Sequence, residues 1–408
     1  MKHKNTAYIS RDALRQNFLA VEKIVADNAQ EAGRPKPRVI CVVKADGYGH
    51  GIAAVAGTLG GAGCGFFAVS SEDEAVELRE IEHRSGRHPE ILILGHIMPE
   101  NVGEMIEQDI TCAVVSLADA EELSAEVSDY NRRSRRANEK PASLKIHIKL
   151  DTGMNRVGFA ADEARLPTTV AEIGLVSADP NLTISGIFTH FACADDELMD
   201  GHPVPGYEIF GGYTGMQLAR YKAALAALED RGIPTGLRHC ANSAAALCLP
   251  DAYFDAVRAG VIIYGLLPNG SIDARFRPAM QLVSTVTHLH TLVPGDRVSY
   301  GATFEADRPM TVATVAAGYA DGFERAYAGC CVRIGDRMYR QIGRICMDQF
   351  MVDVTPDEGE ECPVRVGDPV TLFGGDDGLM TDTLARLAHT INYEVVCKVS
   401  KRVPRVVL

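Results

Sequence analysis

The sequence predicts an α/β protein: a (β/α)8 TIM barrel followed by a mostly β C-terminal domain. Along the first two thirds of the 408 residues, short apolar runs alternate with longer segments of helical periodicity, the pattern of βα units around a parallel sheet. Eight such units occupy about 250 residues, which is typical of a barrel of this type. From about residue 275 the chain is rich in β-branched residues and Gly-Asp turns, as in "CCVRIGDRMYRQIG", which indicates a second, β-rich domain.

The expected barrel strands are short apolar runs next to turn residues or helix-forming segments. They cover residues 38–44, 65–70, 90–96, 111–116, 144–151, 182–190, 237–241 and 256–264. Between them, apolar residues at helical spacing predict helices over "GIAAVAGTLG", "SEDEAVELREIE", "LADAEELSAEVSDY", "DEARLPTTVAEIGL" and "GMQLARYKAALAALEDRG". The barrel is expected to span residues 12–270, and the β domain residues 271–408 with an N-terminal strand within residues 1–11.

Two local features are predicted outside this pattern. A short helix, "MTDTLARLAHTI", is expected to begin at Thr381 or Asp382 in the second domain. The charged run "NRRSRRANEK", residues 131–140, is expected to be a solvated loop.

Composition excludes several classes of partner. The formal net charge of -13 argues against nucleic acid or an anionic membrane, and no apolar run approaches the roughly 20 residues of a membrane span. The N-terminal residues show no export signal. The 11 cysteines form neither a CxxC pair nor a Cys/His ladder, so reduced thiols in the cytoplasm are expected, without a metal site. A small molecule is therefore the expected partner.

Each of five expected strands carries, or leads directly to, residues suited to chemistry or to ligand binding. Because reactive groups of a barrel gather at the carboxyl ends of its strands, these residues are candidates for one site. They are Lys44, Lys149, Asp151, His190, Asn242, Ser243, Arg258 and Gly260.

Lys44 ends an apolar strand and is followed by the flexible "DGYGHG". A lysine amine in a desolvated cavity has a lowered pKa, and the neutral amine can form a Schiff base. Ser243, at an expected helix start, and the amides after Arg258 in "RAGV" suit a phosphate. An aldehyde cofactor that carries a phosphate would use all of these groups.

Nine motifs, in order, resemble those of the alanine racemases, which use pyridoxal 5′-phosphate. They read "VVKADGYGHG", "KLDTGMNRVGF", "GIFTHFA", "HCANSAAAL", "VRAGVIIYGLLP", "VSYGATF", "GYADGF", "GRICMDQFMVDV" and "INYEVVCKVSKRVPR". The resemblance implies pyridoxal phosphate as cofactor and interconversion of L- and D-alanine through an aldimine.

The resemblance also implies roles for individual residues. Lys44 is similar to the lysine that holds the cofactor and acts as base on the D-face, and Tyr300 to the base on the L-face. Arg258 is similar to the arginine at the pyridine nitrogen, with His190 linking it to the tyrosine. The implied phosphate-binding residues are Tyr48, Ser243, Gly260, Val261 and Tyr393, with Asn242 beside them. Arg156 and the Met347 amide are similar to groups that meet the substrate carboxylate, and Lys149 to a lysine that carries a carbamate and orients Arg156.

Inversion of a stereocentre requires a proton to be removed on one face and delivered on the other, so two acid/base groups are needed. In the family these come from the barrel of one subunit and the second domain of the other. The resemblance therefore implies a homodimer with shared active sites, and D-alanine supply for peptidoglycan in the cytoplasm.

Other functions are compatible with parts of the sequence. Segments 131–142 and 194–215 look longer than in the family, and the second follows His190, so a broader racemase that accepts serine is an alternative. Pyridoxal-dependent decarboxylases share the two-domain pattern, but they place an acid where Arg258 stands. Pyridoxal phosphate carrier proteins share the barrel but lack the second domain.

Overall fold

A computed structural model describes residues 3–134, 140–199, 201, 211–271, 273–375 and 379–408. The chain divides into two compact units, and each is described by itself. The barrel unit comprises Phe18–Ala45 and Ala56–Ile263, and the β unit comprises Met1–Asn17, Asp46–Val55 and Tyr264–Leu408. Residues Asp46–Val55 thus group with the β unit, although the sequence places them in the barrel. Among the described helices, none is both long and apolar enough to cross a bilayer.

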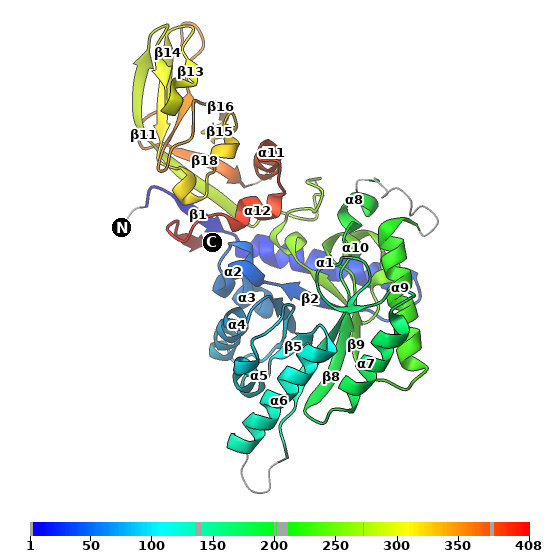
Figure 1. Cartoon of the computed structure of the whole chain (residues 1–408). Coiled ribbons are helices and arrows are strands. Elements are labelled where there is room, and N and C mark those ends of the chain that lie inside the picture. The colour runs from blue at the N-terminus through cyan, green and yellow to red at the C-terminus, as the bar shows by residue number, and fades with distance from the viewer. Residues whose placement is uncertain (1–2, 135–139, 200, 202–210, 272, 376–378) are drawn as a thin grey trace. The chain divides into compact units, whose positions relative to one another are not determined.

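The barrel unit confirms the predicted (β/α)8 fold. Eight parallel strands are paired in the order β5-β4-β3-β2-β10-β9-β8-β6, and β5 also pairs with β6, which closes the sheet (Figure 1). The strands are β2 (Arg38–Val42), β3 (Phe66–Val69), β4 (Glu90–Ile93), β5 (Thr111–Val114), β6 (Leu144–Asp151), β8 (Leu182–Phe188), β9 (Leu237–His239) and β10 (Ala256–Ala259). The two-residue β7 (Phe159–Ala160) pairs with β6. Continuous apolar runs form these strands because both faces of a parallel sheet are buried.

Several strands end earlier than the sequence predicts. The largest difference follows β10, where residues 261–264 form a 3₁₀ turn, η4 (Val261–Tyr264), instead of continuing the strand. The Gly260 amide donates to Ser243 Oγ at 3.0 Å, and its carbonyl accepts from the Ile263 amide at 2.9 Å. Gly260 therefore leaves the strand ladder, and the apolar run "VIIY" is buried as a helical turn, which periodicity alone does not distinguish from a strand.

The predicted helices of the barrel unit are confirmed, and Figure 1 shows α4, α5, α6, α7 and α9 outside its strands. The helices are α1 (Arg11–Glu31), α3 (Ile52–Gly61), α4 (Glu72–Arg84), α5 (Val102–Glu107), α6 (Leu117–Ser134), α7 (Leu166–Ala178), α8 (Ala194–Leu198), α9 (Gly212–Glu229) and α10 (Ser243–Cys248). Helices α1, α5 and α8 were not predicted from the sequence. Sequence signals for α4 are clear: Ser71 Oγ accepts from the Glu74 amide, and acidic residues fill the first turn.

The predicted loop at residues 131–140 and the long segment 194–215 are both partly helical. Residues 131–134 form the last turn of α6, so that part of the loop prediction was wrong, and residues 135–139 lie outside the described residues. Segment 194–215 contains α8 and the start of α9, while residues 200 and 202–210 are not described. Glu197 of α8 accepts from the backbone amides of Tyr213 and Thr214, both at 2.6 Å, which ties the two ends of this segment together.

The chain after β2 forms a short left-handed turn. This element, α2 (Lys44–Tyr48), has φ angles of +55° at Ala45, +53° at Asp46, +61° at Gly47 and +52° at Tyr48. Left-handed conformations cost an L-residue about 1–2 kcal/mol, so neighbouring groups must hold the turn. Asp46 Oδ1 accepts from the Ile52 amide at 2.7 Å, and the Asp46 carbonyl accepts from the Gly51 amide at 2.8 Å. Lys44 is therefore the first residue of a fixed turn, not the last residue of a strand.

The β unit is mainly one sheet with strand order β14-β17-β16-β15-β18-β11-β1-β19, in which β14 also pairs with β11 (Figure 1). Its strands pair antiparallel except for β1 and β19, which are parallel. The strands are β1 (Thr6–Ile9), β11 (Met280–Leu292), β14 (Met310–Val315), β15 (Cys331–Ile334), β16 (Arg337–Ile342), β17 (Phe350–Asp353), β18 (Pro369–Gly374) and β19 (Arg405–Val407), with the separate pair β12 (Arg297–Val298) and β13 (Phe304–Glu305). Their alternating pattern buries one face, and Leu292, Met310 and Val312 lie in the core formed there.

Two helices follow β18 in the β unit. The predicted helix exists, but α11 (Leu379–Leu387) begins before Thr381. A second helix, α12 (Asn392–Cys397), was not predicted. The Asn392 side chain donates to the Leu267 carbonyl oxygen and to Asp382 Oδ1, both at 2.8 Å, which connects the two helices.

Candidate active site

The site in the barrel unit is built around Arg258, a buried residue of β10. Its Nη1 donates to the His239 carbonyl oxygen at 3.1 Å and lies 2.8 Å from His239 Nδ1. Its Nη2 donates to the carbonyl oxygens of Thr189, at 2.7 Å, and Cys240, at 3.2 Å, and lies 3.1 Å from His190 Nδ1. The last residue of β9 and residues just after β8 and β9 thus fix the guanidinium at the carboxyl ends of the strands, next to His190.

These contacts determine which imidazole nitrogens carry protons. A guanidinium can only donate, so His190 and His239 accept at Nδ1 and carry hydrogen on Nε2. His239 Nε2 lies 3.0 Å from His147 Nδ1, so His147 also accepts at Nδ1. A Cβ atom on Gly186 would lie 2.4 Å from the His147 ring, and the glycine therefore provides the space for that ring. His190 is left with an Nε2–H that can donate to a ligand.

All three imidazoles are neutral at physiological pH. Burial lowers the pKa of His147 to about 3, and the charge of Arg258 acts in the same direction. The same two causes hold the pKa values of His190 and His239 well below the ordinary range. The charges that lower the pKa of His190 are those of Arg258, Lys149, Arg156 and Lys44. Four predicted site cations therefore act electrostatically on one histidine.

We expect the neutral histidines to make stability depend on pH. Between pH 6.5 and their folded pKa values, the unfolded chain binds protons that the folded chain does not, so stability falls as pH falls. Each such histidine contributes about 1.4 kcal/mol per pH unit at most. In His147→Asn, Oδ1 can accept in place of Nδ1 but cannot titrate. This variant should therefore lose about 1 kcal/mol less stability than the wild type between pH 6 and pH 5. Urea unfolding at both pH values measures the difference, and equal losses would contradict the assignment.

Lys149 lies on β6, and its amine is buried. Nζ donates to the Leu150 carbonyl oxygen at 2.8 Å. Burial lowers the pKa of Lys149 to about 7; the charges of Arg258 and Arg156 lower it as well, while Asp151 raises it. A substantial fraction of this amine is therefore neutral at physiological pH and can act as a nucleophile.

The loop after β6 carries Arg156. Asp151 Oδ1 accepts from the backbone amides of Gly153, at 2.9 Å, and Asn155, at 3.0 Å. Asn155 has a φ of +52°, and Arg156, which follows it, is exposed. The carboxylate at the strand end therefore shapes the loop, and Arg156 is presented at the same end of the barrel as Lys149.

The predicted phosphate-binding groups of the barrel unit lie together. Ser243 Oγ accepts from the Gly260 amide at 3.0 Å, and Asn242 caps α10 by accepting from the Ala245 amide at 3.1 Å. Val261 begins the 3₁₀ turn directly after Gly260. Hydroxyl and amide donors at the start of α10 and of η4 provide the kind of groups that bind a phosphate.

The remaining predicted cofactor contacts, Tyr48 and Tyr393, belong to the β unit. Their ring centroids are 6.3 Å apart, and the Tyr264 ring lies 4.7 Å from that of Tyr48. A residue far away in the sequence holds the backbone next to Tyr48: Arg405 Nε donates to the Gly49 carbonyl oxygen at 3.0 Å. Gly49 has no space for a side chain, since a Cβ would lie 2.4 Å from the Val396 carbonyl oxygen. The structure thus brings the two tyrosines of the "DGYGHG" and "INYEVV" motifs together.

Tyr300 and Met347 are exposed on loops of the β unit, with 71% and 51% of their surface accessible. Tyr300 begins the 3₁₀ turn η5 (Tyr300–Ala302), and the φ angles are +66° at Ser299, which precedes the turn, and +51° at Ala302, its last residue. Ser299 Oγ donates to the Arg344 carbonyl oxygen at 2.7 Å, three residues before Met347. Strained backbone of this kind is typical of functional loops, and here it holds a large aromatic side chain in solvent.

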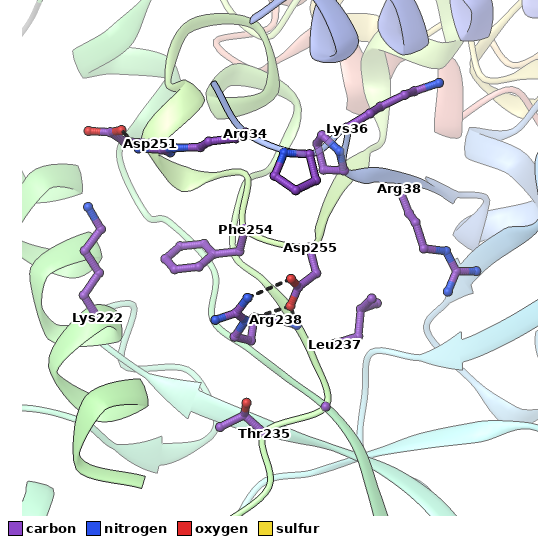
Figure 2. A pocket seen from close by; sticks show the side chains of 13 residues that line it. Arg34, Lys36, Arg38, Lys222, Thr235, Leu237, Arg238, Asp251, Phe254 and Asp255 are labelled. Carbon is purple, nitrogen blue, oxygen red and sulfur yellow. Dashed lines mark hydrogen bonds and ion pairs between the residues drawn. The ribbon is translucent and has the colours of Figure 1, made fainter. Parts of the chain in front are cut away.

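A separate cavity of about 840 Å³ lies at the opposite ends of the barrel strands (Figure 2). It contains several cations, but most of them have carboxylate partners: Arg34 pairs with Asp251 at 2.7 Å, and Arg238 forms two bonds of 2.8 Å with Asp255. Figure 2 shows Phe254 beside this second pair. Polar residues at the amino ends of barrel strands usually serve stability. We therefore assign the active site to the carboxyl ends.

Sequence reasoning missed three residues that support this site. His147 and His239 extend the contacts of Arg258, and Gln217 of α9, which is fully buried, donates to the His190 carbonyl oxygen at 3.0 Å and accepts from the Ala192 amide at 2.9 Å. A signal existed for His147, because "IHIKLD" places it two residues before Lys149, on the same face of the strand. Gln217 lies in a helix without any comparable signal.

Comparisons with known proteins cover nearly the whole chain. Residues 9–268 match the family described as alanine racemase, N-terminal domain, and residues 279–407 match alanine racemase, C-terminal domain. An alanine racemase of Desulforamulus reducens is 38% identical over 410 residues, covering 100% of this chain and 99% of the relative. The alanine racemase structure of Clostridium difficile has a TM-score of 0.84 and 33% identity, covering 100% of this chain and 96% of that one. The structure of alanine racemase from Bacillus anthracis with bound L-Ala-P has a TM-score of 0.81 and 29% identity, with coverages of 100% and 96%.

Proposed function

The chain belongs to the alanine racemase family, whose members are isomerases that interconvert amino-acid enantiomers, and we propose that it interconverts L- and D-alanine with pyridoxal 5′-phosphate as cofactor. The observation that carries this proposal is the group of cations at the carboxyl ends of the barrel strands, with the hydrogen-bonded Arg258 at its centre. Such a site favours anions, and both the cofactor's phosphate and the carboxylate of an amino acid are anionic.

The residues present fit this cofactor. Ser243 and the Val261 amide provide donors for a phosphate, and Gly260 lies beside them with its amide donating to Ser243 Oγ. Arg258 can donate to a pyridine nitrogen but cannot give up its proton to it. Lys44 is the amine that we expect to hold the aldehyde carbon. When bound, pyridoxal phosphate supplies the electron delocalisation that makes a Cα proton removable.

Two groups of the chain would handle the proton at Cα. We propose that Lys44 exchanges it on the D-face and Tyr300 of the partner subunit on the L-face. His190 supports the second role, because its Nδ1 accepts from Arg258 and its Nε2–H can therefore donate to a phenol oxygen. Burial keeps His190 neutral, so this donor does not compete for the transferred proton.

The exposure of Tyr300 and Met347 supports a homodimer with shared sites. Tyr300, Tyr319 and Met347 are exposed on loops that are hydrogen-bonded to one another, and large side chains gathered in this way are typical of an interaction surface. We propose that these loops complete the barrel site of a second subunit, with Arg156 and the Met347 amide at the substrate carboxylate. We also place the enzyme in the cytoplasm, where D-alanine would supply peptidoglycan synthesis.

Lys149 is proposed to carry a carbamate. Its pKa of about 7 leaves a neutral amine that can attack CO₂. The resulting anion would be stabilised by the charges of Arg258 and Arg156, both of which act electrostatically on Lys149. In ¹³CO₂-bicarbonate buffer at pH 8, the wild type should show one ¹³C carbamate signal that Lys149→Met lacks. A wild-type spectrum identical to that of Lys149→Met would exclude the modification.

A chiral assay with a lysine-mapping step tests the proposed function. Purified protein with pyridoxal phosphate is given L-alanine, L-serine or L-lysine, and both enantiomers are quantified by chiral chromatography. We expect D-alanine to form fastest, in line with the binding of L-Ala-P by the related Bacillus anthracis enzyme. Borohydride reduction should attach the cofactor to Lys44. Absence of D-alanine, or attachment to a different lysine, would refute the proposal.

A further inference from the structure

Three exposed loops of the β unit are joined to one another by hydrogen bonds. The Tyr319 amide donates to the Cys346 carbonyl oxygen at 3.1 Å, and the Ala320 amide donates to the Met347 carbonyl oxygen at 3.0 Å. Gly318 lies so close to this second loop that a Cβ would be 2.3 Å from both carbonyl oxygens. The second loop in turn accepts from Ser299, next to Tyr300. The loops that carry Tyr300, Tyr319 and Met347 therefore depend on one another for position.

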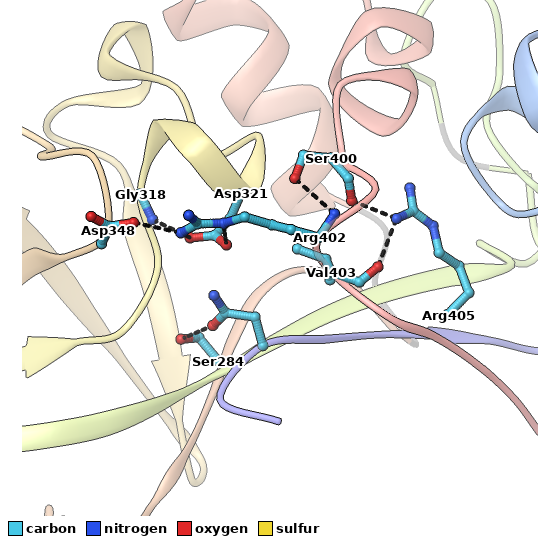
Figure 3. Close-up of polar contacts among 9 residues, drawn as sticks. Ser284, Gly318, Asp321, Asp348, Ser400, Arg402, Val403 and Arg405 are labelled. Atoms are coloured by element: carbon cyan, nitrogen blue, oxygen red, sulfur yellow. Dashed lines mark hydrogen bonds and ion pairs between the residues drawn. The ribbon is translucent and has the colours of Figure 1, made fainter. Parts of the chain in front are cut away.

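Arg402 links two of these loops from a distant part of the sequence (Figure 3). Its Nε donates to Asp321 Oδ1 at 2.7 Å, and its Nη2 donates to Asp321 Oδ2 at 3.1 Å and to Asp348 Oδ1 at 2.7 Å. Asp321 Oδ2 also accepts from the Gly318 amide at 3.0 Å. One guanidinium thus joins the Gly318–Asp321 turn to the turn that contains Met347.

The two carboxylates differ in environment. The Asp321 side chain is 4% exposed, whereas that of Asp348 is 55% exposed. A solvated ion pair contributes little by itself, but a buried carboxylate that loses its cation is strongly destabilised. The bonds to the buried Asp321 therefore fix the position of the Arg402 guanidinium. From that position, Nη2 donates to Asp348 and holds the turn that carries it.

We propose that Arg402 is a positioning residue for substrate: it holds the Met347 turn against the Gly318–Asp321 turn, so that the Met347 amide keeps its place for the substrate carboxylate. The proposal rests on the proposed function, in which that amide meets the carboxylate. It predicts that loss of Arg402 weakens alanine binding more than it slows turnover, because the groups that exchange the Cα proton are retained.

Amide hydrogen exchange and kinetics on the full-length holoenzyme test this role. In Arg402→Gln, the amides of Tyr319 and Ala320 should exchange at least about tenfold faster than in the wild type, because their acceptors lie on the released turn. The KM for L-alanine should rise about 10- to 100-fold, with a smaller change in kcat. Arg308→Gln is the matched control, since Arg308 forms an ion pair of 2.9 Å with Asp353 in the same unit but away from these loops. It should leave exchange and KM unchanged.

A double variant separates positioning from simple neutralisation of a buried charge. Asp321→Asn combined with Arg402→Gln removes both charges and retains a side-chain oxygen for the Gly318 amide. If Arg402 only neutralises the buried Asp321, the double variant should recover the wild-type KM. If Arg402 positions the loops, KM should stay high and the amides of Tyr319 and Ala320 should stay unprotected. Wild-type exchange and KM in Arg402→Gln, or recovery in the double variant, would overturn the proposal. If the wild type shows no racemisation, the exchange measurement still decides whether Arg402 holds the loops.

Discussion

Tyr300→Phe is expected to lower the racemisation rate by about 10²- to 10⁴-fold in both directions, the usual contribution of a positioned acid/base group. The change removes one hydroxyl from a side chain that is 71% exposed, so folding should be preserved. In D₂O, the variant should still exchange the Cα hydrogen of D-alanine, which Lys44 handles, but not that of L-alanine. Proton NMR of each enantiomer measures the two exchange rates separately.

A control and a mixing experiment complete this test. Tyr319→Phe removes a phenol from the neighbouring loop and should lower the rate by less than about tenfold, because no acid/base role depends on it. Lys44→Ala mixed with Tyr300→Phe should regain about one quarter of the wild-type activity after subunit exchange, since half of the dimers then contain one intact shared site. Equal exchange of both enantiomers in Tyr300→Phe would refute the assigned face, and a mixture without activity would refute shared sites.

Arg258→Met should have the largest effect on the barrel unit. The change leaves the carbonyl oxygens of Thr189, His239 and Cys240 without this donor in a buried site, at a cost of roughly 3–5 kcal/mol in the free energy of unfolding. Burial already lowers the pKa of Arg258 to about 10, so part of this cost is offset by removing a desolvated cation. Urea unfolding measures the net loss.

The same variant should raise the pKa of His147 from about 3, because the charge of Arg258 is its second largest cause after burial. Titration of the imidazole signals by NMR follows this change independently of stability. Arg238→Met is the control: Arg238 is partly exposed and pairs with Asp255 at the other end of the barrel, so it should cost only about 1 kcal/mol and leave His147 unchanged. An unshifted His147 in Arg258→Met would contradict the arrangement described.

The sequence predicted the fold better than the local conformation around Lys44. Continuous apolar runs such as "FFAV" of β3 indicate buried parallel strands, and β6 was predicted with its observed bounds. The left-handed turn was not predictable, because Ala45 and Tyr48 are not residue types that favour positive φ. The hydrogen bond from the Ile52 amide to Asp46 Oδ1 helps to hold this turn, and residue spacing in the sequence does not reveal such a bond.

The same limit applies to the candidate site. Lysine, histidine and arginine at strand ends could be recognised because a barrel gathers its strand ends at one face. Arg402 could not be recognised as a link to Asp321 and Asp348, because the pairing joins three segments that are far apart in sequence. Resemblance to the family's motifs identifies which residues this chain shares with the family. Only the coordinates show that Arg258 donates to His239 and that His239 in turn donates to His147.

The position of β1 between β11 and β19 has a consequence for the order of folding. Tyr8 is paired with Gln281 on one side and with Val406 on the other, so this sheet joins segments from both ends of the chain. During synthesis, the barrel strands can pair soon after they leave the ribosome, whereas β1 must wait for residues made last. Closing so long a loop is entropically costly, and the β unit should therefore assemble slowly, after release of the finished polypeptide.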